Sequence, residues 1–111
     1  MAEIVIIPSD EFRRQAKRLA KKYKSLANDL ARFQQELQDN PFIGVDLGDG
    51  KRKIRLQVAS KGKGNGGMRV ITFIVVKTEA SITVYLITLY DKSEYQDVSD
   101  KYVDQVIKGL K

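Results

Sequence analysis

The chain of 111 residues contains no cysteine and no histidine. Without cysteine it can form neither disulfides nor thiolate metal sites, and its composition is compatible with a reducing compartment. Without histidine it can build no histidine metal site, no Ser-His or Cys-His triad and no acid–base chemistry with paired histidines. Any catalysis must therefore depend on other side chains.

Long apolar runs are also missing. No segment approaches the roughly 20 apolar residues that a membrane span needs, and the N-terminus lacks the charged-then-apolar pattern of a signal peptide. We therefore expect a cytoplasmic protein with no membrane association. The length of 111 residues corresponds to one domain, residues 1–111, whose core is large enough to need no disulfide or metal.

The net charge of +6 is unevenly distributed. Residues 13–24 contain seven lysines and arginines and no acid, and residues 51–77 contain eight and no acid. If the two blocks meet in the fold, they form the kind of basic surface that attracts nucleic acid. For residues 13–24 alone, the solvated face of a helix is the favoured interpretation.

The first part of the chain predicts a strand followed by helix. An apolar run at residues 3–8 ends in proline and predicts a short strand. Ser9 or Asp10 can cap a helix, and across residues 12–37 apolar side chains recur every three or four positions. This periodicity is compatible with one long helix or with two. We favour two helices that separate near Ser25, because a single helix of that length would outrun the sheet of so small a domain.

The second part of the chain predicts a three-stranded meander. Residues 40–50, which begin with Asn-Pro, predict a loop. Residues 51–58 alternate between apolar and mostly cationic side chains, as in a strand with one core face and one basic face. Residues 68–77 and 82–90 are apolar on both faces and predict central strands, and Ser99 then caps a last helix. The order β-α-α-β-β-β-α predicts an α+β domain, with a helical hairpin on one face of a small antiparallel sheet and a C-terminal helix.

The most informative stretch is the glycine-rich segment at residues 61–69, Lys-Gly-Lys-Gly-Asn-Gly-Gly-Met-Arg. Its four glycines and its asparagine can adopt positive φ and bring backbone amides close to a ligand. Lys61, Lys63 and Arg69 add three cations, so the segment suits a polyanion such as a phosphate backbone. A solvated hairpin loop is an equal alternative, because basic glycine-rich loops are common.

Three stretches together resemble the RelE/ParE toxin superfamily, particularly its HigB-like branch. They are the basic strand at 51–58, the Lys-Gly-Lys-Gly-x-Gly-Gly-x-Arg-Val-Ile segment at 61–71 and the Leu-Ile-Thr-Leu-Tyr-Asp-Lys-Ser-Glu ending at 86–94. Members of this superfamily are toxins of bacterial toxin–antitoxin pairs. The RelE and HigB branches cut messenger RNA in the ribosomal decoding site, whereas the ParE branch inhibits DNA gyrase without nuclease chemistry.

The resemblance implies a ribosome-dependent endoribonuclease toxin that acts on mRNA and is neutralised by a cognate antitoxin of the helix-turn-helix type. Two rivals remain open: a ParE-like gyrase inhibitor without catalysis, and a nucleic-acid-binding module that is not toxic. Fold alone cannot separate these functions.

The residue types available imply cleavage without a metal or other cofactor, because the basic region holds no histidine and no carboxylate cluster. The expected reaction is attack of the ribose 2′-OH on the adjacent phosphate, which gives a cyclic phosphate and a free 5′-OH. Arginine and lysine side chains would stabilise the charge that develops on the phosphoryl oxygens. A lysine crowded by other cations has a lowered pKa, which would let it exchange protons near neutral pH.

Arg69 is the first candidate for binding the scissile phosphate, because a guanidinium is always charged and can bind two oxygens at once. The resemblance also implies a functional arginine at this junction; the alternative is a structural ion pair. Lys63, Tyr90 and Lys92 are the other catalytic candidates. The resemblance implies catalytic or base-stacking groups at the end of the last strand, while Tyr90 could equally be a core aromatic.

Lys53, Arg55 and Lys61 are the candidates for RNA binding. Lys53 and Arg55 share one face of a strand and could reach the same groove, although a solvated sheet face is equally compatible. Lys61 could hold the RNA backbone or move a proton. The chain departs from the RelE pattern because residues 82–90 contain no second arginine, and it lacks the histidine that some HigB proteins use.

Overall fold

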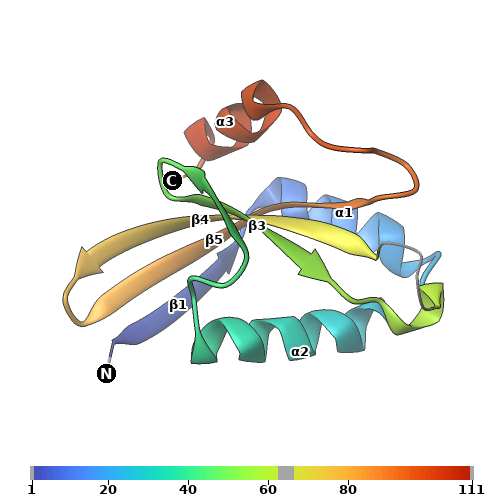
Figure 1. The fold of residues 1–111 in the computed structure, drawn as a ribbon, viewed down its shortest axis with the longest axis horizontal. Helices are drawn as coiled ribbons and strands as arrows, with labels where there is room; N and C mark the ends of the chain where they lie inside the picture. The colour runs from blue at the N-terminus through green and yellow to red at the C-terminus, as the bar shows by residue number, and fades with distance from the viewer. Residues whose placement is uncertain (1, 63–66, 111) are drawn as a thin grey trace.

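The computed structural model describes residues 2–62 and 67–110, in which three helices pack against a five-stranded sheet (Figure 1). In chain order the elements are β1 (Glu3–Pro8), α1 (Asp10–Ala20), α2 (Leu26–Asp39), β2 (Val45–Gly48), β3 (Lys51–Leu56), a 3₁₀ turn (Ala59–Lys61), β4 (Met68–Thr78), β5 (Ser81–Asp91) and α3 (Asp100–Lys108). The α+β order predicted from the sequence is confirmed, with β2 as one additional strand.

The strands lie in the order β1-β5-β4-β3-β2. β3, β4 and β5 form the predicted antiparallel meander, and β1 joins it at one edge as a parallel neighbour of β5. At the other edge, β2 pairs antiparallel with β3, with Val45 opposite Lys53. The prediction of a loop throughout residues 40–50 is therefore wrong for this strand. All four residues of β2 are exposed, so the sequence shows no burial pattern for this strand. Gly48 and Gly50, with φ of 91° and 83°, are typical of a turn.

Serine side chains cap the N-termini of α1 and α3, as the sequence predicts, whereas Ser25 before α2 makes no such capping bond. Ser9 Oγ accepts a hydrogen bond from Phe12 N (3.0 Å) and donates one to the carbonyl of Ile87 (2.7 Å), which ties the start of α1 to β5. Ser99 Oγ accepts a hydrogen bond from the α3 backbone (3.1 Å). The interruption between α1 and α2, which spans Ser25, confirms two helices instead of one.

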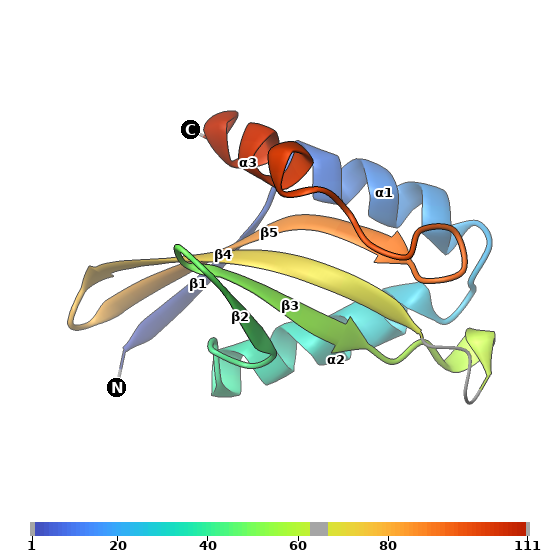
Figure 2. The same cartoon turned by 45° about the horizontal axis from the view of Figure 1, so that its top comes forward.

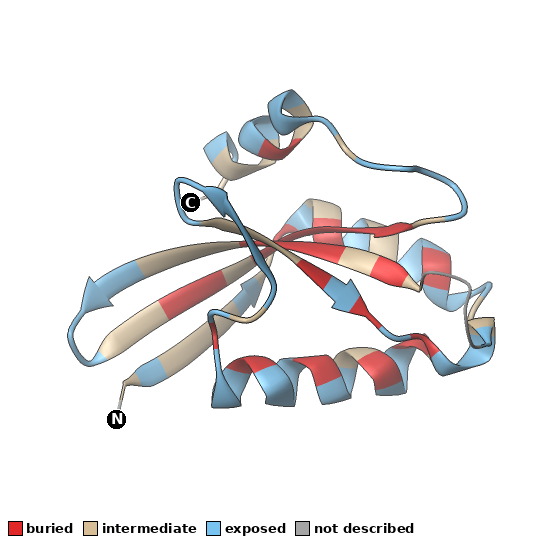
Figure 3. Ribbon diagram, viewed as in Figure 1, coloured by how far each residue is buried: buried red, intermediate tan, exposed pale blue. Residues whose placement is uncertain are grey.

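The helices divide between the two faces of the sheet (Figures 2 and 3). α1 and α2 cover one face, where they pack on residues such as Leu56, Val70 and Leu86. α3 covers part of the other face, around Ile71 and Ile87. The predicted alternation in residues 51–58 is confirmed by three buried side chains: Ile54, Leu56 and Val58. The intervening side chains of β3 consequently point toward the face that carries α3.

Candidate nucleic-acid interface

The face of the sheet toward α3 carries a row of three candidate side chains. Arg69 of β4 lies directly opposite Arg55 of β3 on one side and Tyr90 of β5 on the other. Opposite residues of an antiparallel pair have Cβ atoms roughly 4.5–5.5 Å apart and share a face. Met68 and Val70 are buried with α1 and α2, so Arg69 between them points to the α3 side. The period of two in each strand thus brings these three residues together.

Two lysines of β3 extend this surface. We call the basic face the set Lys51, Lys53, Arg55 and Arg69. Lys53 Nζ lies 3.0 and 3.1 Å from the two carboxylate oxygens of Asp97, in the segment between β5 and α3. Lys51 Nζ lies 3.0 Å from Asp104 Oδ1 of α3. Both lysines therefore face acids from the part of the chain that follows β5.

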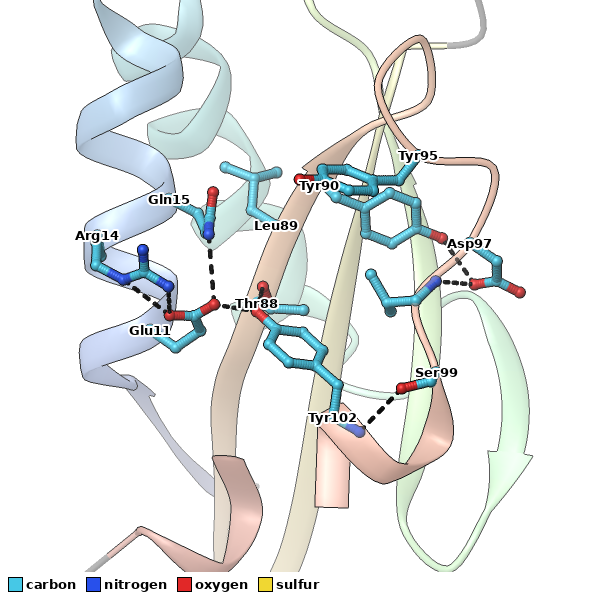
Figure 4. A pocket seen from close by; sticks show the side chains of 11 residues that line it. Glu11, Arg14, Gln15, Thr88, Leu89, Tyr90, Tyr95, Asp97, Ser99 and Tyr102 are labelled. Atoms are coloured by element: carbon cyan, nitrogen blue, oxygen red, sulfur yellow. Dashed lines mark hydrogen bonds and ion pairs between the residues drawn. The ribbon is translucent and has the colours of Figure 1, made fainter. Parts of the chain in front are cut away.

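Tyr90 is placed as a core aromatic. The residue is 3% exposed and packs with Ile87 and Val103, while its hydroxyl donates a hydrogen bond to Asp97 Oδ1 (3.1 Å, Figure 4). Burial, assisted by the negative charge of Asp97, raises the pKa of Tyr90 to about 12. The buried ring is not available to stack on a base in this conformation. Only the hydroxyl of Tyr90 could contact a ligand on the basic face.

A cavity of about 470 Å³ adjoins Tyr90, between α1, the end of β5 and the segment that leads into α3 (Figure 4). On the α1 side, Glu11 accepts hydrogen bonds from Arg14 and from the Tyr102 hydroxyl of α3. Burial opposes ionisation of Glu11, but the hydrogen bonds it accepts outweigh burial and lower its pKa. Tyr95, which is 55% exposed, also lines the cavity. Tyr95 thus supplies an exposed aromatic ring in the cavity that adjoins Tyr90.

On the other face of the sheet, Lys61 and Asp91 form a buried ion pair. Their side chains are 5% and 0% exposed. Asp91 also accepts hydrogen bonds from the hydroxyls of Tyr23 (2.6 Å) and Ser93 (2.8 Å). Burial alone would raise the pKa of Asp91, but the hydrogen bonds from Lys61, Tyr23 and Ser93 hold it well below its ordinary value. Lys61 therefore does not lie with Arg69 on the basic face, and its position gives no support to RNA binding.

Comparison with known proteins shows which known fold this architecture resembles. No family model matches the chain. Its structure is similar to that of the E. coli toxin RelE, solved as a double arginine-to-alanine mutant in the free state, with a TM-score of 0.59 and 14% identity over 100% of both chains. The chain has a RelE-like fold. At this identity the similarity establishes architecture and leaves the chemistry to the residues themselves.

Within this RelE-like fold, the residues on the two sides of the undescribed stretch, Lys61 and Gly67, bind the end of β5. Lys61 precedes it and binds Asp91, while the carbonyl of Gly67 accepts a hydrogen bond from the N–H of Lys92 (3.5 Å). The Lys92 ammonium donates to the carbonyl of Gln96 (2.9 Å). Lys63 lies outside the described residues. The two described ends of the segment, Lys61 and Gly67, thus both contact the end of β5.

The structure adds residues that the sequence did not single out, above all Asp97 and Asp91. Each is bound to a lysine far away in the chain, so no local pattern could indicate the pairing. Among residues 2–62 and 67–110, no group of three or more acids, cysteines or histidines could hold a metal ion, and no helix is long and apolar enough to cross a membrane.

Proposed function

We propose that the chain is the toxin of a bacterial toxin–antitoxin pair and that it cleaves mRNA on the ribosome. The observation that carries this proposal is the basic face, of which Lys53, Arg55 and Arg69 lie together on one side of a RelE-like sheet. Such a group of cations, aligned by two rigid strands, suits a phosphate backbone more than an isolated flexible cation would.

In the proposed reaction, the ribose 2′-oxygen forms a bond to phosphorus while the bond from phosphorus to the 5′-oxygen breaks. The 2′-OH loses its proton to a base and the departing 5′-oxygen gains one, which leaves a cyclic phosphate and a free 5′-OH. Arg69 holds the phosphoryl oxygens and stabilises the charge that develops there. Lys53 and Arg55 bind the flanking backbone, and Lys63 and Lys92 are the candidates for proton transfer.

A pKa of about 12 keeps the Tyr90 phenol protonated at neutral pH, so Tyr90 contributes as a hydrogen-bond donor and not as a base. Tyr95, whose exposed ring lines the cavity that adjoins Tyr90, is the better candidate for stacking on a base.

The proposed toxin needs a protein partner that blocks the basic face. A cognate antitoxin, of the helix-turn-helix type that the family resemblance implies, would either cover the face directly or displace α3. Both routes act on one surface, because α3 carries Asp104 against Lys51. A purified complex in which Arg69 and Lys92 stay accessible and α3 stays in place would contradict both routes.

A ParE-like gyrase inhibitor is the second candidate, and one observation favours it. Lys61 is held in a buried ion pair and the Tyr90 hydroxyl binds Asp97, so two groups proposed for the site are engaged elsewhere in the chain. A toxin that binds gyrase without catalysis would need neither the Lys61 ammonium nor the Tyr90 hydroxyl at its binding surface.

The deciding experiment is expression of the chain alone in bacteria, with RNA ends and plasmid supercoiling followed together. The nuclease proposal expects new 5′-OH ends in translated mRNA and unchanged supercoiling, and it expects these ends to disappear with Arg69→Ala. Altered supercoiling without new RNA ends would replace the nuclease with the gyrase inhibitor.

A further inference from the structure

The carboxylate of Asp97 is bound in the way that a protein binds a small anion. Its Oδ2 lies 3.1 Å from Lys53 Nζ. Its Oδ1 accepts hydrogen bonds from Lys53 Nζ (3.0 Å), the Val98 N–H (2.8 Å) and the Tyr90 hydroxyl (3.1 Å, Figure 4). Two of these donors, Lys53 and Tyr90, come from different strands of the sheet. The ammonium and the hydroxyl therefore converge on one point above the sheet, and a carboxylate fills that point.

This point belongs to the same surface as the row of arginines. Tyr90 lies directly opposite Arg69, and Lys53 is two residues from Arg55 on the same face of β3. An anion held by Lys53 and Tyr90 would thus be next to the guanidinium of Arg69. A phosphate offers the same negative oxygens as a carboxylate and one or two more, and arginine and lysine bind both groups through charge-assisted hydrogen bonds.

We propose that Lys53 and Tyr90, beside Arg69, form a phosphate-binding site and that Asp97 occupies this site in the free chain as an internal competitor. The inference rests on the proposed function, which makes the ligand a phosphodiester of RNA. Binding of RNA then requires the Asp97 carboxylate to leave and a phosphate to take its place.

Because water reaches this ion pair, replacement of the carboxylate by a phosphate costs little free energy. The side chain of Asp97 is 58% exposed and that of Lys53 is 27% exposed. Exposed ion pairs of this kind contribute little free energy, so the competitor lowers the affinity for phosphate by up to about fivefold. Asp97 lies in the irregular segment between β5 and α3. Its side chain can therefore rotate into solvent while both of these elements stay folded.

The competitor and a merely structural ion pair lead to opposite results when Asp97 is replaced. If Asp97 only orders the segment before α3, its loss disorders the site and weakens binding of phosphate. If Asp97 competes for the site, its loss strengthens binding. Asp104 supplies a matched control, because it pairs with Lys51 in the same way and its replacement changes the net charge by the same amount.

The experiment is an NMR titration of the isolated chain with adenosine 3′-monophosphate, inorganic phosphate and a hexanucleotide of 2′-deoxyribose, which lacks the attacking 2′-OH. Asp97→Asn and Asp97→Ala should bind the nucleotide and the hexanucleotide about two- to fivefold more tightly than the wild type. Asp104→Asn should gain less, and Lys53→Met should lose affinity. The shifts should centre on Lys53, Tyr90 and Arg69.

Equal gains for Asp97→Asn and Asp104→Asn would reduce the effect to net charge and overturn the proposal, as would weaker binding by both Asp97 variants. Equal affinity for inorganic phosphate and for the hexanucleotide would remove RNA as the ligand. The proposed function is tested separately by cleavage of mRNA on programmed ribosomes. Tighter binding by the Asp97 variants without any cleavage by the wild type would keep the site and reject the nuclease.

Discussion

Two lysine–aspartate pairs lie on opposite faces of the same sheet and differ in almost everything except their chemistry. Lys61 and Asp91 are 5% and 0% exposed, whereas Lys53 and Asp97 are 27% and 58% exposed. Both aspartates follow or end β5, only a few residues apart. The difference in burial separates a pair that holds the fold from a pair that can open to a ligand.

The environment of each aspartate explains the division. Asp91 binds Lys61 of the 3₁₀ turn, and the hydroxyls of Tyr23, in the connection between α1 and α2, and of Ser93 complete its hydrogen bonds. Removal of Lys61 leaves the buried charge of Asp91 without a counter-charge, which is costly, and removal of either hydroxyl takes away one of its hydrogen bonds. Asp97 faces solvent, so water can replace Lys53 at once. The same two side-chain types thus perform opposite tasks because water reaches only one pair.

The largest expected effect is on stability, from Lys61→Met. The substitution keeps most of the buried stem and removes the ammonium, so Asp91 remains buried and charged. Breaking a buried pair in this way costs about 3–5 kcal/mol, a large part of the roughly 5–15 kcal/mol that stabilises a typical domain. Urea unfolding followed by circular dichroism measures it. Lys53→Met is the control, and an equal loss in both variants would abolish the distinction between the pairs.

The second prediction separates activity from stability. Arg69→Ala should lose on the order of 3 kcal/mol or more of transition-state stabilisation, by analogy with removal of one oxyanion donor. Arg69→Lys should also lose much of the activity, because an ammonium cannot reproduce the two-pronged guanidinium contact. Cleavage of mRNA on programmed ribosomes is the measurement. Lys17→Ala, on the exposed side of α1, is the control; it should matter mainly at low salt. Near-wild-type cleavage by Arg69→Lys would reduce this residue to a general cation.

The third prediction concerns acid. The folded chain holds the pKa of Asp91 below its ordinary value of 3.8, so the stabilisation is fully present above that pH, where the carboxyl is ionised in both states. As pH falls below 3.8, the unfolded chain takes up a proton that the folded chain does not, and unfolding becomes easier. The loss continues until the folded carboxyl is itself protonated. Urea unfolding between pH 6 and pH 2 should show this decline, and a Lys61→Met variant should show a weaker one. An equal decline in both would assign the effect to other acids.

The contrast between the pairs also marks what could be predicted from sequence. The strands, the meander and the shared face of Lys53 and Arg55 follow from a period of two, which is a local property of each strand, whereas the pairing of Arg55 with Arg69 depends on the register between two strands. Strand β2 could not be found this way, because it buries nothing. Lys61 lies in a glycine-rich basic segment and therefore resembles a ligand-binding lysine. In the structure it is buried in an ion pair with Asp91, 30 residues later in the chain.

Asp91 illustrates the same limit from the other side. An acid at the end of a strand that is otherwise buried is a weak signal of a compensating cation, but nothing in the sequence says which cation supplies the charge. The competitor role of Asp97 is harder still to foresee, since it depends on how the segment after β5 folds back over β3. Local periodicity can predict which face a residue occupies, whereas tertiary packing decides which opposite charge it meets.

The smallest expected effect is the stability change from opening the exposed pair. Asp97→Asn should change the free energy of unfolding by less than about 1 kcal/mol, because each partner regains water when the other is removed. The effect should shrink between 0.05 M and 1 M salt, as screening shortens the Debye length to roughly 3 Å. Urea unfolding at both salt concentrations measures it, with Asp104→Asn as the matched control. A loss as large as that of Lys61→Met would mean that Asp97 holds the fold. The carboxylate could then not yield its place to a phosphate, and the site on Lys53 and Tyr90 would stay closed to RNA.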